Sequence, residues 1–87
     1  MYIVYVLYSS KFNKIYIGYT SDLEQRFLSH NKLSTKGYTK RYRPWQIAIQ
    51  EEYLTKQEAM QREKQLKGGQ GRAWVWSKLE ESGLISA

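Results

Sequence analysis

Tyr16, Arg26 and His30 bring side chains of catalytic type into one short stretch of the sequence, residues 16–30 (YIGYTSDLEQRFLSH). In a helix, Asp22, Arg26 and His30 would line one side, because each follows the last at an interval of four residues. An arginine beside an apolar stripe needs an anion, and either Asp22 or a substrate phosphate can supply it. A lone histidine on an apolar face is usually a core residue, but the neighbouring arginine favours a site here.

The same stretch divides into a strand and a helix. A run of β-prone residues, 15–17 (IYI), ends at Gly18, a residue type that lets a second backbone or a ligand approach closely. Ser21 and Glu24 have the spacing of a capping box, which predicts a helix over residues 21–30 with Ser21 as N-cap. The tyrosine and the arginine would then meet where the strand passes into the helix.

A second tyrosine is predicted to face Tyr16 across a β-hairpin. Residues 2–8 (YIVYVLY) are apolar or aromatic throughout, which is typical of a strand covered on both faces. A connection over residues 9–12 and a second strand over residues 13–19 would pair Tyr5 with Tyr16. Any connection of even length keeps both phenols on one face, because side chains alternate along a strand. A core aromatic pair is the alternative interpretation.

A carboxylate lies within the apolar face of a later helix. Thr55 has capping-box spacing to Glu58 and predicts a helix over residues 55–67. One face of this helix carries Ala59, Met60, Glu63 and Leu66. Burying Glu63 is costly unless a cation, a metal ion or hydrogen bonds compensate it. Metal binding and pairing with a nearby lysine or arginine are equally compatible with the pattern.

The remaining segments complete a mixed chain of strands and helices. Residues 31–44 are polar and basic and predict a loop, and residues 45–53 (WQIAIQEEY) alternate as a third strand does. A last helix is expected over residues 72–82. This order predicts one small α/β domain that spans residues 1–87.

Basic residues gather in the middle of the chain. The net charge is +6, and no acidic residue occurs between Glu24 and Glu51. That interval holds the cations Arg26, Lys32, Lys36, Lys40, Arg41 and Arg43, interleaved with the aromatic residues Tyr38, Tyr42 and Trp45. Cations attract phosphates and aromatic rings stack on bases, so the pattern favours a nucleic-acid partner over a generically basic protein. Lys36, Lys40, Arg41 and Arg43 are the predicted nucleic-acid-binding residues.

Composition excludes several other classes of protein. The chain has no cysteine, so disulfides and thiolate metal sites are excluded and a cytoplasmic location is the simplest expectation. No apolar run approaches the roughly 20 residues of a membrane-spanning helix, and no membrane partner is expected. The N-terminal apolar run is too short for a signal peptide and lacks a basic region before it.

The ordered set of candidate residues resembles the GIY-YIG nuclease family, in particular its small stand-alone members. The resemblance covers residues 2–67 and rests on four matches: residues 3–5 (IVY) at the Gly-Ile-Tyr motif, residues 16–18 (YIG) at the Tyr-Ile-Gly motif, residues 20–23 (TSDL) with Arg26 and His30 at the first helix, and Ala59 with Glu63 at the Ala-xxx-Glu helix. Each match alone is weak, but their order is specific.

The resemblance implies a three-stranded antiparallel sheet flanked by helices and a metal-dependent endonuclease that hydrolyses phosphodiester bonds in DNA, in repair or processing. Glu63 would hold a single Mg²⁺ or Mn²⁺ ion. Tyr16 would act as general base or activate the attacking water, and Tyr5 would orient it. Arg26 would neutralise charge on the phosphorane, and His30 would orient a group or shuttle a proton. These types suit the chemistry, because phosphodiester hydrolysis requires charge stabilisation on the non-bridging oxygens.

Departures from the family pattern add secondary candidates and a second hypothesis. Ile3 replaces the first glycine of the motif and leaves the catalytic positions intact. Tyr19 stands where some family members carry a lysine, so Tyr19 joins Gly18 as a secondary site residue. The chain leaves no room for a separate DNA-binding domain, so specificity would come from DNA structure, such as branches or damage, or from a protein partner. RNA stays open as a substrate, and a non-catalytic nucleic-acid-binding module is the alternative function.

Overall fold

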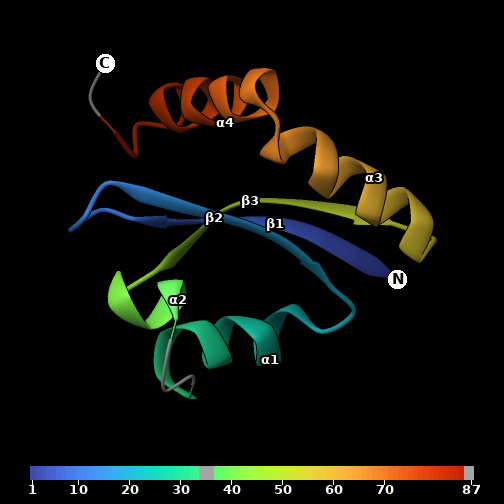
Figure 1. Cartoon of the computed structure of the whole chain (residues 1–87), viewed down its shortest axis with the longest axis horizontal. Helices are drawn as coiled ribbons and strands as arrows, with labels where there is room; N and C mark the ends of the chain where they lie inside the picture. The colour runs from blue at the N-terminus through green and yellow to red at the C-terminus, as the bar shows by residue number, and fades with distance from the viewer. Residues whose placement is uncertain (34–36, 86–87) are drawn as a thin grey trace.

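A three-stranded antiparallel sheet forms the centre of the molecule (Figure 1). The computed structural model describes residues 1–33 and 37–85. Its strands are β1 (Tyr2–Ser9), β2 (Lys14–Thr20) and β3 (Gln46–Tyr53), in the order β2-β1-β3. β1 is therefore the central strand, and both β2 and β3 are edges. This sheet, flanked by helices, confirms the predicted fold class.

Helices cover both faces of the sheet (Figure 1). One face carries α1 (Leu23–Leu28), the π-helical turn η1 (Ser29–Leu33) and α2 (Tyr38–Arg41), and the other carries α3 (Lys56–Lys67) and α4 (Gly69–Glu81). β1 is apolar on both sides because it contributes to both layers: Val4 and Val6 pack in the core under α3 and α4, and Tyr5 and Leu7 pack on the side of α1.

The β1–β2 hairpin places Tyr5 and Tyr16 on the same face, which confirms the prediction from strand alternation. Their direct pairing was wrong, however, because Tyr5 lies opposite Gly18. The connection lies one residue later than expected. Asn13 adopts a left-handed conformation there, with φ at 54°, and asparagine tolerates that conformation better than most residues.

The first helix begins one residue later than the capping-box spacing predicts. Asp22, rather than Ser21, is the N-cap, and its carboxylate accepts a hydrogen bond from the Gln25 backbone N–H at 3.1 Å. Aspartate caps as well as serine does, so sequence spacing alone does not distinguish them. The expected continuous helix over residues 21–30 was also wrong, because the α-helix ends at Leu28 and passes into η1, which carries His30.

The segment expected to be a loop contains the short helix α2, so the prediction for residues 31–44 was only partly right. β3 is confirmed, but its pairing with β1 shifts register between Val6 and Leu7. Ile47 therefore pairs with Leu7, whereas Ile49 pairs with Val6, and the two isoleucines face opposite sides of the sheet. The apparent alternation of the sequence hides this bulge.

The second face of the sheet follows the sequence prediction closely. Thr55 is the N-cap of α3, and its hydroxyl accepts a hydrogen bond from the Glu58 backbone N–H at 3.2 Å. Ala59 and Leu66 are buried as expected, but Met60 is 47% exposed and does not join the core. The last helix starts at Gly69 rather than near residue 72. In the described part of the chain, no helix is long and apolar enough to cross a membrane.

Candidate active site

Tyr5, Tyr16 and His30 form one aromatic cluster between the sheet and α1. The rings of Tyr5 and Tyr16 are 6.3 Å apart, and the His30 ring lies 5.9 Å from Tyr5 and 4.6 Å from Tyr16. The Tyr5 hydroxyl and His30 Nε2 are 2.9 Å apart and hydrogen-bonded. Tyr5 and His30 are buried, whereas Tyr16 is half-buried. The structure thus brings together residues from β1, β2 and η1.

Gly18 makes this arrangement sterically possible. A Cβ atom at this position would lie 2.6 Å from the Tyr5 hydroxyl oxygen and 3.3 Å from the Tyr16 ring. Contacts as short as the first do not occur between real atoms of these types, so any side chain at position 18 would displace the Tyr5 phenol. The glycine of the YIG sequence is therefore required by the packing of the two tyrosines across the hairpin.

Arg26 reaches this cluster from α1. The Tyr5 phenol raises the pKa of Arg26, chiefly as a hydrogen-bond partner. Asp22, the other candidate anion, caps the helix instead, and no Asp22–Arg26 salt bridge forms within the described residues. A phenol O–H is a better donor than a neutral imidazole N–H, and an imidazole nitrogen is the better acceptor, so we assign Tyr5 as the donor to His30 Nε2. Arg26 lies within electrostatic reach of the Tyr5 phenol.

Burial sets the protonation of both members of the Tyr5–His30 pair. Removal from water, together with the nearby Tyr16 and Glu63, raises the pKa of Tyr5 to about 12, and Arg26 only partly opposes this shift. Burial, assisted by the charges of Arg26 and Arg43, lowers the pKa of His30 to about 4. At neutral pH, Tyr5 is therefore a neutral phenol and His30 a neutral imidazole.

Glu63 joins the site from the opposite side of the sheet. A cavity of about 470 Å³ at edge strand β2 is lined by Tyr2, Tyr5, Tyr16, Gly18, Tyr19, Ser21, Arg26, Lys56 and Glu63. Glu63 is the sole carboxylate among these lining residues, and its side chain is 21% exposed. Its Oε1 lies 3.5 Å from Lys67 Nζ one helical turn later. The geometry is therefore compatible with both interpretations of Glu63, because its carboxylate contacts Lys67 and also lines the cavity.

The donor set of this cavity suits a weakly held divalent ion. Within residues 1–33 and 37–85, no group of three or more His, Asp or Glu side chains is placed to hold a metal. A hard ion such as Mg²⁺ nevertheless needs few protein carboxylates, because it keeps several of its waters. Glu63 is partly exposed, and its long contact with the half-exposed Lys67 is easily broken. Arg26 and Lys56 would oppose the ion until a substrate phosphate adds negative charge.

The remaining predicted site residues lie in different surroundings. Tyr19 lines the cavity and also packs against the core under α3 and α4. Lys40 and Arg41 are exposed on α2, and Arg41 lies over the Tyr42 ring. Arg43 is half-buried and donates to the backbone carbonyls of His30 at 2.7 Å and Ser29 at 3.3 Å. Lys36 lies outside the described residues.

Lys56 and Tyr2 line the cavity although the sequence did not single them out. Lys56 is the first residue of α3 and precedes Glu63 by seven residues, which is two helical turns. That spacing puts the two side chains on one side of the helix and could have identified Lys56. Tyr2 sits three residues before Tyr5 on β1, and no pattern in the sequence distinguishes it from the other tyrosines.

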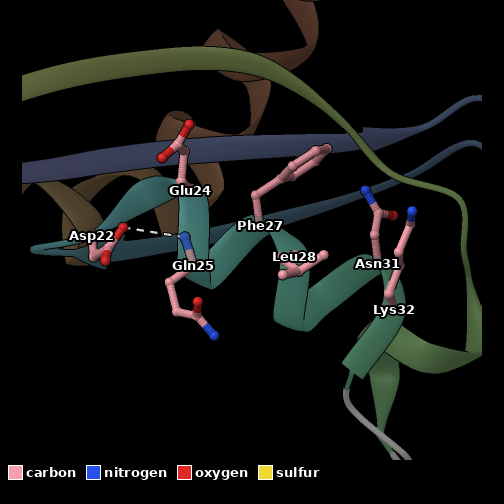
Figure 2. Close-up of a pocket in the computed structure, with 7 residues that line it drawn as sticks. All are labelled: Asp22, Glu24, Gln25, Phe27, Leu28, Asn31 and Lys32. Atoms are coloured by element: carbon pink, nitrogen blue, oxygen red, sulfur yellow. Dashed lines mark hydrogen bonds between the residues drawn. The ribbon is translucent and has the colours of Figure 1, made fainter.

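A second depression, of about 500 Å³, lies on the outer side of α1 and η1 (Figure 2). Two of its polar side chains, those of Asp22 and Asn31, are committed to local structure. Asp22 caps α1, and the Asn31 side chain donates to the Trp45 carbonyl at 3.0 Å and accepts from the Trp45 N–H at 2.7 Å. None of Tyr5, Tyr16, Arg26 and Glu63 lines it. The cavity at β2 is therefore the better candidate for chemistry.

Comparison with known proteins identifies the family of this chain. The family model of the GIY-YIG catalytic domain matches residues 1–75. Relatives include UPF0213 proteins of Staphylococcus saprophyticus (42% identity over 66% of this chain and 70% of the relative) and Staphylococcus haemolyticus (41% over 74% and 77%). The UPF0213 protein YazA of Bacillus subtilis is 45% identical over 61% of this chain and 54% of its own length. The chain therefore belongs to the GIY-YIG family, a family of nucleases.

Proposed function

We propose that this protein is a metal-dependent endonuclease that hydrolyses phosphodiester bonds in DNA, with its active site in the cavity at β2. The observation that supports this most directly is the lining of that cavity, where one carboxylate, two cations and two stacked tyrosines converge from α1, α3 and the hairpin. A catalytic cavity of this charge suits a substrate that is itself an anion.

Arg26 and Lys56 would bind the substrate phosphate. Both are exposed enough to meet a bulky polymer, and both line the cavity. Charge on the non-bridging oxygens increases as the phosphorus becomes pentacoordinate, and a guanidinium fixed beside it stabilises that charge. Arg26 lies beside the Tyr5 phenol and lines the cavity, so its guanidinium is near the reacting phosphate before the substrate binds.

Glu63 would hold the divalent ion, for which Mg²⁺ and Mn²⁺ are the candidates. When bound, such an ion supplies Lewis-acid stabilisation and lowers the pKa of water. The protein's own contribution is a single carboxylate on a rigid helix that also carries Lys56. The substrate phosphate would complete the coordination, which couples metal binding to DNA binding.

We assign the proton-accepting role to Tyr16 and a positioning role to Tyr5. A phenol with a pKa near 12 that donates to His30 is a poor general base at neutral pH. Tyr16 is half-buried and lines the cavity, so it can meet the attacking water. In the reaction, the water oxygen bonds to phosphorus and passes a proton to the Tyr16 oxygen, which releases its own proton to solvent. The bond from phosphorus to the leaving sugar oxygen breaks, and that oxygen takes up a proton from solvent. A neutral His30 would orient Tyr5 rather than shuttle this proton.

We propose a role in DNA repair or processing, because the chain resembles a nuclease family that includes repair enzymes, and a cytoplasmic location, because the chain has no cysteine. The exposed cations Lys40 and Arg41 on α2 would bind the flanking DNA. Replacing both should weaken binding to every sequence and leave cleavage at saturating DNA unchanged.

The test is cleavage of supercoiled plasmid, single-stranded DNA, branched DNA and RNA with Mg²⁺ or Mn²⁺. Glu63→Gln and Arg26→Ala should each lower the cleavage rate by about 10²- to 10³-fold. Glu80→Gln, an exposed glutamate on α4, is the matched control and should keep full activity. Metal-dependent cleavage that survives both site variants would contradict the assigned site. Salt-sensitive binding without cleavage of any substrate would favour a non-catalytic binding module instead.

A further inference from the structure

A separate cavity of about 260 Å³ adjoins the active site along edge strand β2. It is lined by Ile15, Tyr16, Ile17, Tyr38, Lys67 and Arg72. Tyr16 lines both this cavity and the one that contains Glu63. Lys67 lines this second cavity, and its Nζ lies 3.5 Å from Oε1 of Glu63, which lines the active-site cavity. A ligand in this second cavity would therefore lie directly beside the reacting phosphate.

Tyr38 forms an exposed aromatic shelf in this cavity. Its ring packs 5.9 Å from Trp45 at an interplanar angle of 29° and 4.8 Å from Tyr42. Its hydroxyl donates to the Ile15 carbonyl on β2 at 3.2 Å. The residue nevertheless remains 45% exposed. A ring held by its neighbours but open to solvent is preorganised for stacking, because little side-chain entropy is lost when a ligand binds.

Cations lie on the other side of the cavity. Arg72 Nε donates to the Lys67 carbonyl at 3.1 Å, which orients the guanidinium at the start of α4. Burial, and then the neighbouring Tyr42, raises the pKa of Tyr38, while the charge of Arg72 lowers it, so Arg72 lies within electrostatic reach of the Tyr38 hydroxyl. Within the described residues, no salt bridge involves Arg72, and no carboxylate lines this cavity.

We propose that this cavity binds one unpaired nucleotide next to the phosphodiester that is cut, with its base stacked on Tyr38 and its phosphate held by Arg72 and Lys67. The proposal deepens the proposed function and rests on it for the identity of the neighbouring site. A base must be unpaired to offer its face to a protein ring, since bases within a duplex stack on one another. The cavity is also too small for a duplex. The substrate would accordingly be single-stranded, branched or locally opened at the cut.

The test measures binding alone, by fluorescence anisotropy in EDTA, so that no chemistry contributes. The probes are dye-labelled oligothymidylate, oligouridylate and a short blunt-ended duplex, which has no unpaired base. Tyr38→Ala should weaken oligothymidylate binding by about 5- to 100-fold and duplex binding by less than about twofold. Tyr38→Phe, which keeps the ring, should bind nearly as the unmodified protein does. Oligouridylate shows whether RNA supplies the same nucleotide.

Arg72→Gln provides a second variant that does not disturb the aromatic packing. It should reduce the salt dependence of single-strand binding by about one phosphate contact, whereas Lys64→Gln on the outer side of α3 should not. Equal weakening of oligothymidylate and duplex binding by Tyr38→Ala, or no weakening of either, would overturn the proposal.

The two proposals fail separately. Absence of cleavage in the plasmid assay, with selective loss of single-strand binding in Tyr38→Ala, would remove the nuclease assignment and support the nucleotide site. Metal-dependent cleavage that depends on Glu63, with single-strand binding unaffected by Tyr38→Ala, would support the nuclease assignment and remove the nucleotide site.

Discussion

The two faces of the sheet are built from different kinds of side chain. Under α3 and α4 the core is mostly aliphatic: Val4, Val6, Ile15, Ile17, Ala59, Leu66, Val75 and Leu79 are buried there, joined by Tyr8. Under α1 and α2 the buried residues are Tyr5, Leu7 and Trp45, with Tyr16, Leu23, Phe27 and Tyr42 packed against them. The first layer has an almost wholly aliphatic centre, and its other tyrosines and tryptophans, Tyr2, Tyr19, Tyr53, Trp74 and Trp76, are only partly buried. The second layer has side chains that donate and accept hydrogen bonds at its centre.

Most buried polar groups on the aromatic side are paired with one another or with the backbone. The exception among the described residues is the Ser9 hydroxyl, which follows Tyr5 and Leu7 on the same face of β1 and has no hydrogen-bond partner. Tyr5 is hydrogen-bonded to His30, and Trp45 Nε1 donates to the Thr39 carbonyl at 2.7 Å. Such networks fix side chains in a single arrangement, because any other would leave a buried polar group unpaired. We infer that the aliphatic layer contributes most of the stability and the aromatic layer positions the chemistry. Glu63 connects them, since it belongs to α3 but faces the cavity at β2.

The largest expected effect on stability comes from the aliphatic layer. Leu79→Ala removes a fully buried side chain on α4 and should lower the free energy of unfolding by about 2–5 kcal/mol, measured by chemical denaturation. Leu28→Ala, on the 40% exposed leucine of α1, is the matched control and should cost much less. The division between the layers requires that folded Leu79→Ala protein cleave DNA at the normal rate, and a large loss of rate would contradict it.

The next-largest expected effect is a dependence of stability on pH, caused by His30 in the aromatic layer. The pKa of His30 is about 4 when folded, against 6.5 for an ordinary histidine. Well above pH 6.5, His30 is neutral in both the folded and the unfolded state, so its burial causes no pH-dependent loss of stability. As pH falls below 6.5, the unfolded chain binds a proton that the folded protein does not, so stability is lost, by about 2 kcal/mol at pH 5 and about 3 kcal/mol at pH 4.

Because His30 is the only histidine in the chain, this effect has a clean readout. Denaturation at several pH values should show the decline between pH 6.5 and pH 5, where most carboxylates do not titrate. His30→Gln should abolish the decline in that range. An NMR titration in which the folded histidine protonates near pH 6.5 would show that the imidazole is not held neutral by burial.

Local patterns in the sequence predicted the main elements of both layers. Strand alternation placed Tyr5 and Tyr16 on one face without knowledge of the exact turn, because any even shift of register preserves the face. Features that depend on backbone geometry were not predictable. The left-handed Asn13 moved the hairpin register by two positions, and the bulge in β3 placed Ile47 and Ile49 on opposite faces although their spacing suggests one.

Tertiary contacts account for the remaining differences in the candidate site. The basic segment suggested nucleic-acid contacts for Arg43, but its guanidinium donates to backbone carbonyls of η1. Tyr38 was one aromatic residue among several in the sequence, and its contacts with the Ile15 carbonyl and the Tyr16 ring bring it to the active-site edge. Residues far apart in the sequence come into contact at β2, and amino-acid composition does not reveal which residues these are.

A pair of glycines offers a sharper comparison of the layers. Gly18→Ala would place a Cβ 2.6 Å from the Tyr5 hydroxyl oxygen and should displace the phenol that is hydrogen-bonded to His30 and lies beside Arg26. We expect the cleavage rate to fall by about 10²-fold, because small misplacements at a catalytic site have effects of this size. Gly71→Ala would instead meet the α3 backbone at the Gln65 carbonyl and Leu66 Cα. It should lower stability by about 1–3 kcal/mol and leave the rate for the folded protein intact.

Gly69→Ala is the control for both variants, since nothing lies within 4 Å of its added Cβ. It should change neither the cleavage rate nor, by more than about 1 kcal/mol, the stability. If Gly18→Ala lowered stability but not the rate, Tyr5 would be a core residue rather than a positioning residue.

The smallest effect compares the N-caps of α1 and α3. Asp22→Ala and Thr55→Ala should each cost about 1 kcal/mol, because each removes a hydrogen bond to an N-terminal backbone N–H of its helix. Their effects on cleavage should differ. α1 has six residues and Arg26 is its fourth, whereas α3 has 12 residues and Glu63 is its eighth. Fraying of the first turn therefore reaches Arg26 but not Glu63. Asp22→Ala should lower the cleavage rate by about threefold at saturating DNA, and Thr55→Ala should leave it unchanged. Equal losses of rate in both variants would mean that the catalytic groups depend on overall stability, and the distinction between a stabilising layer and a positioning layer would then fail.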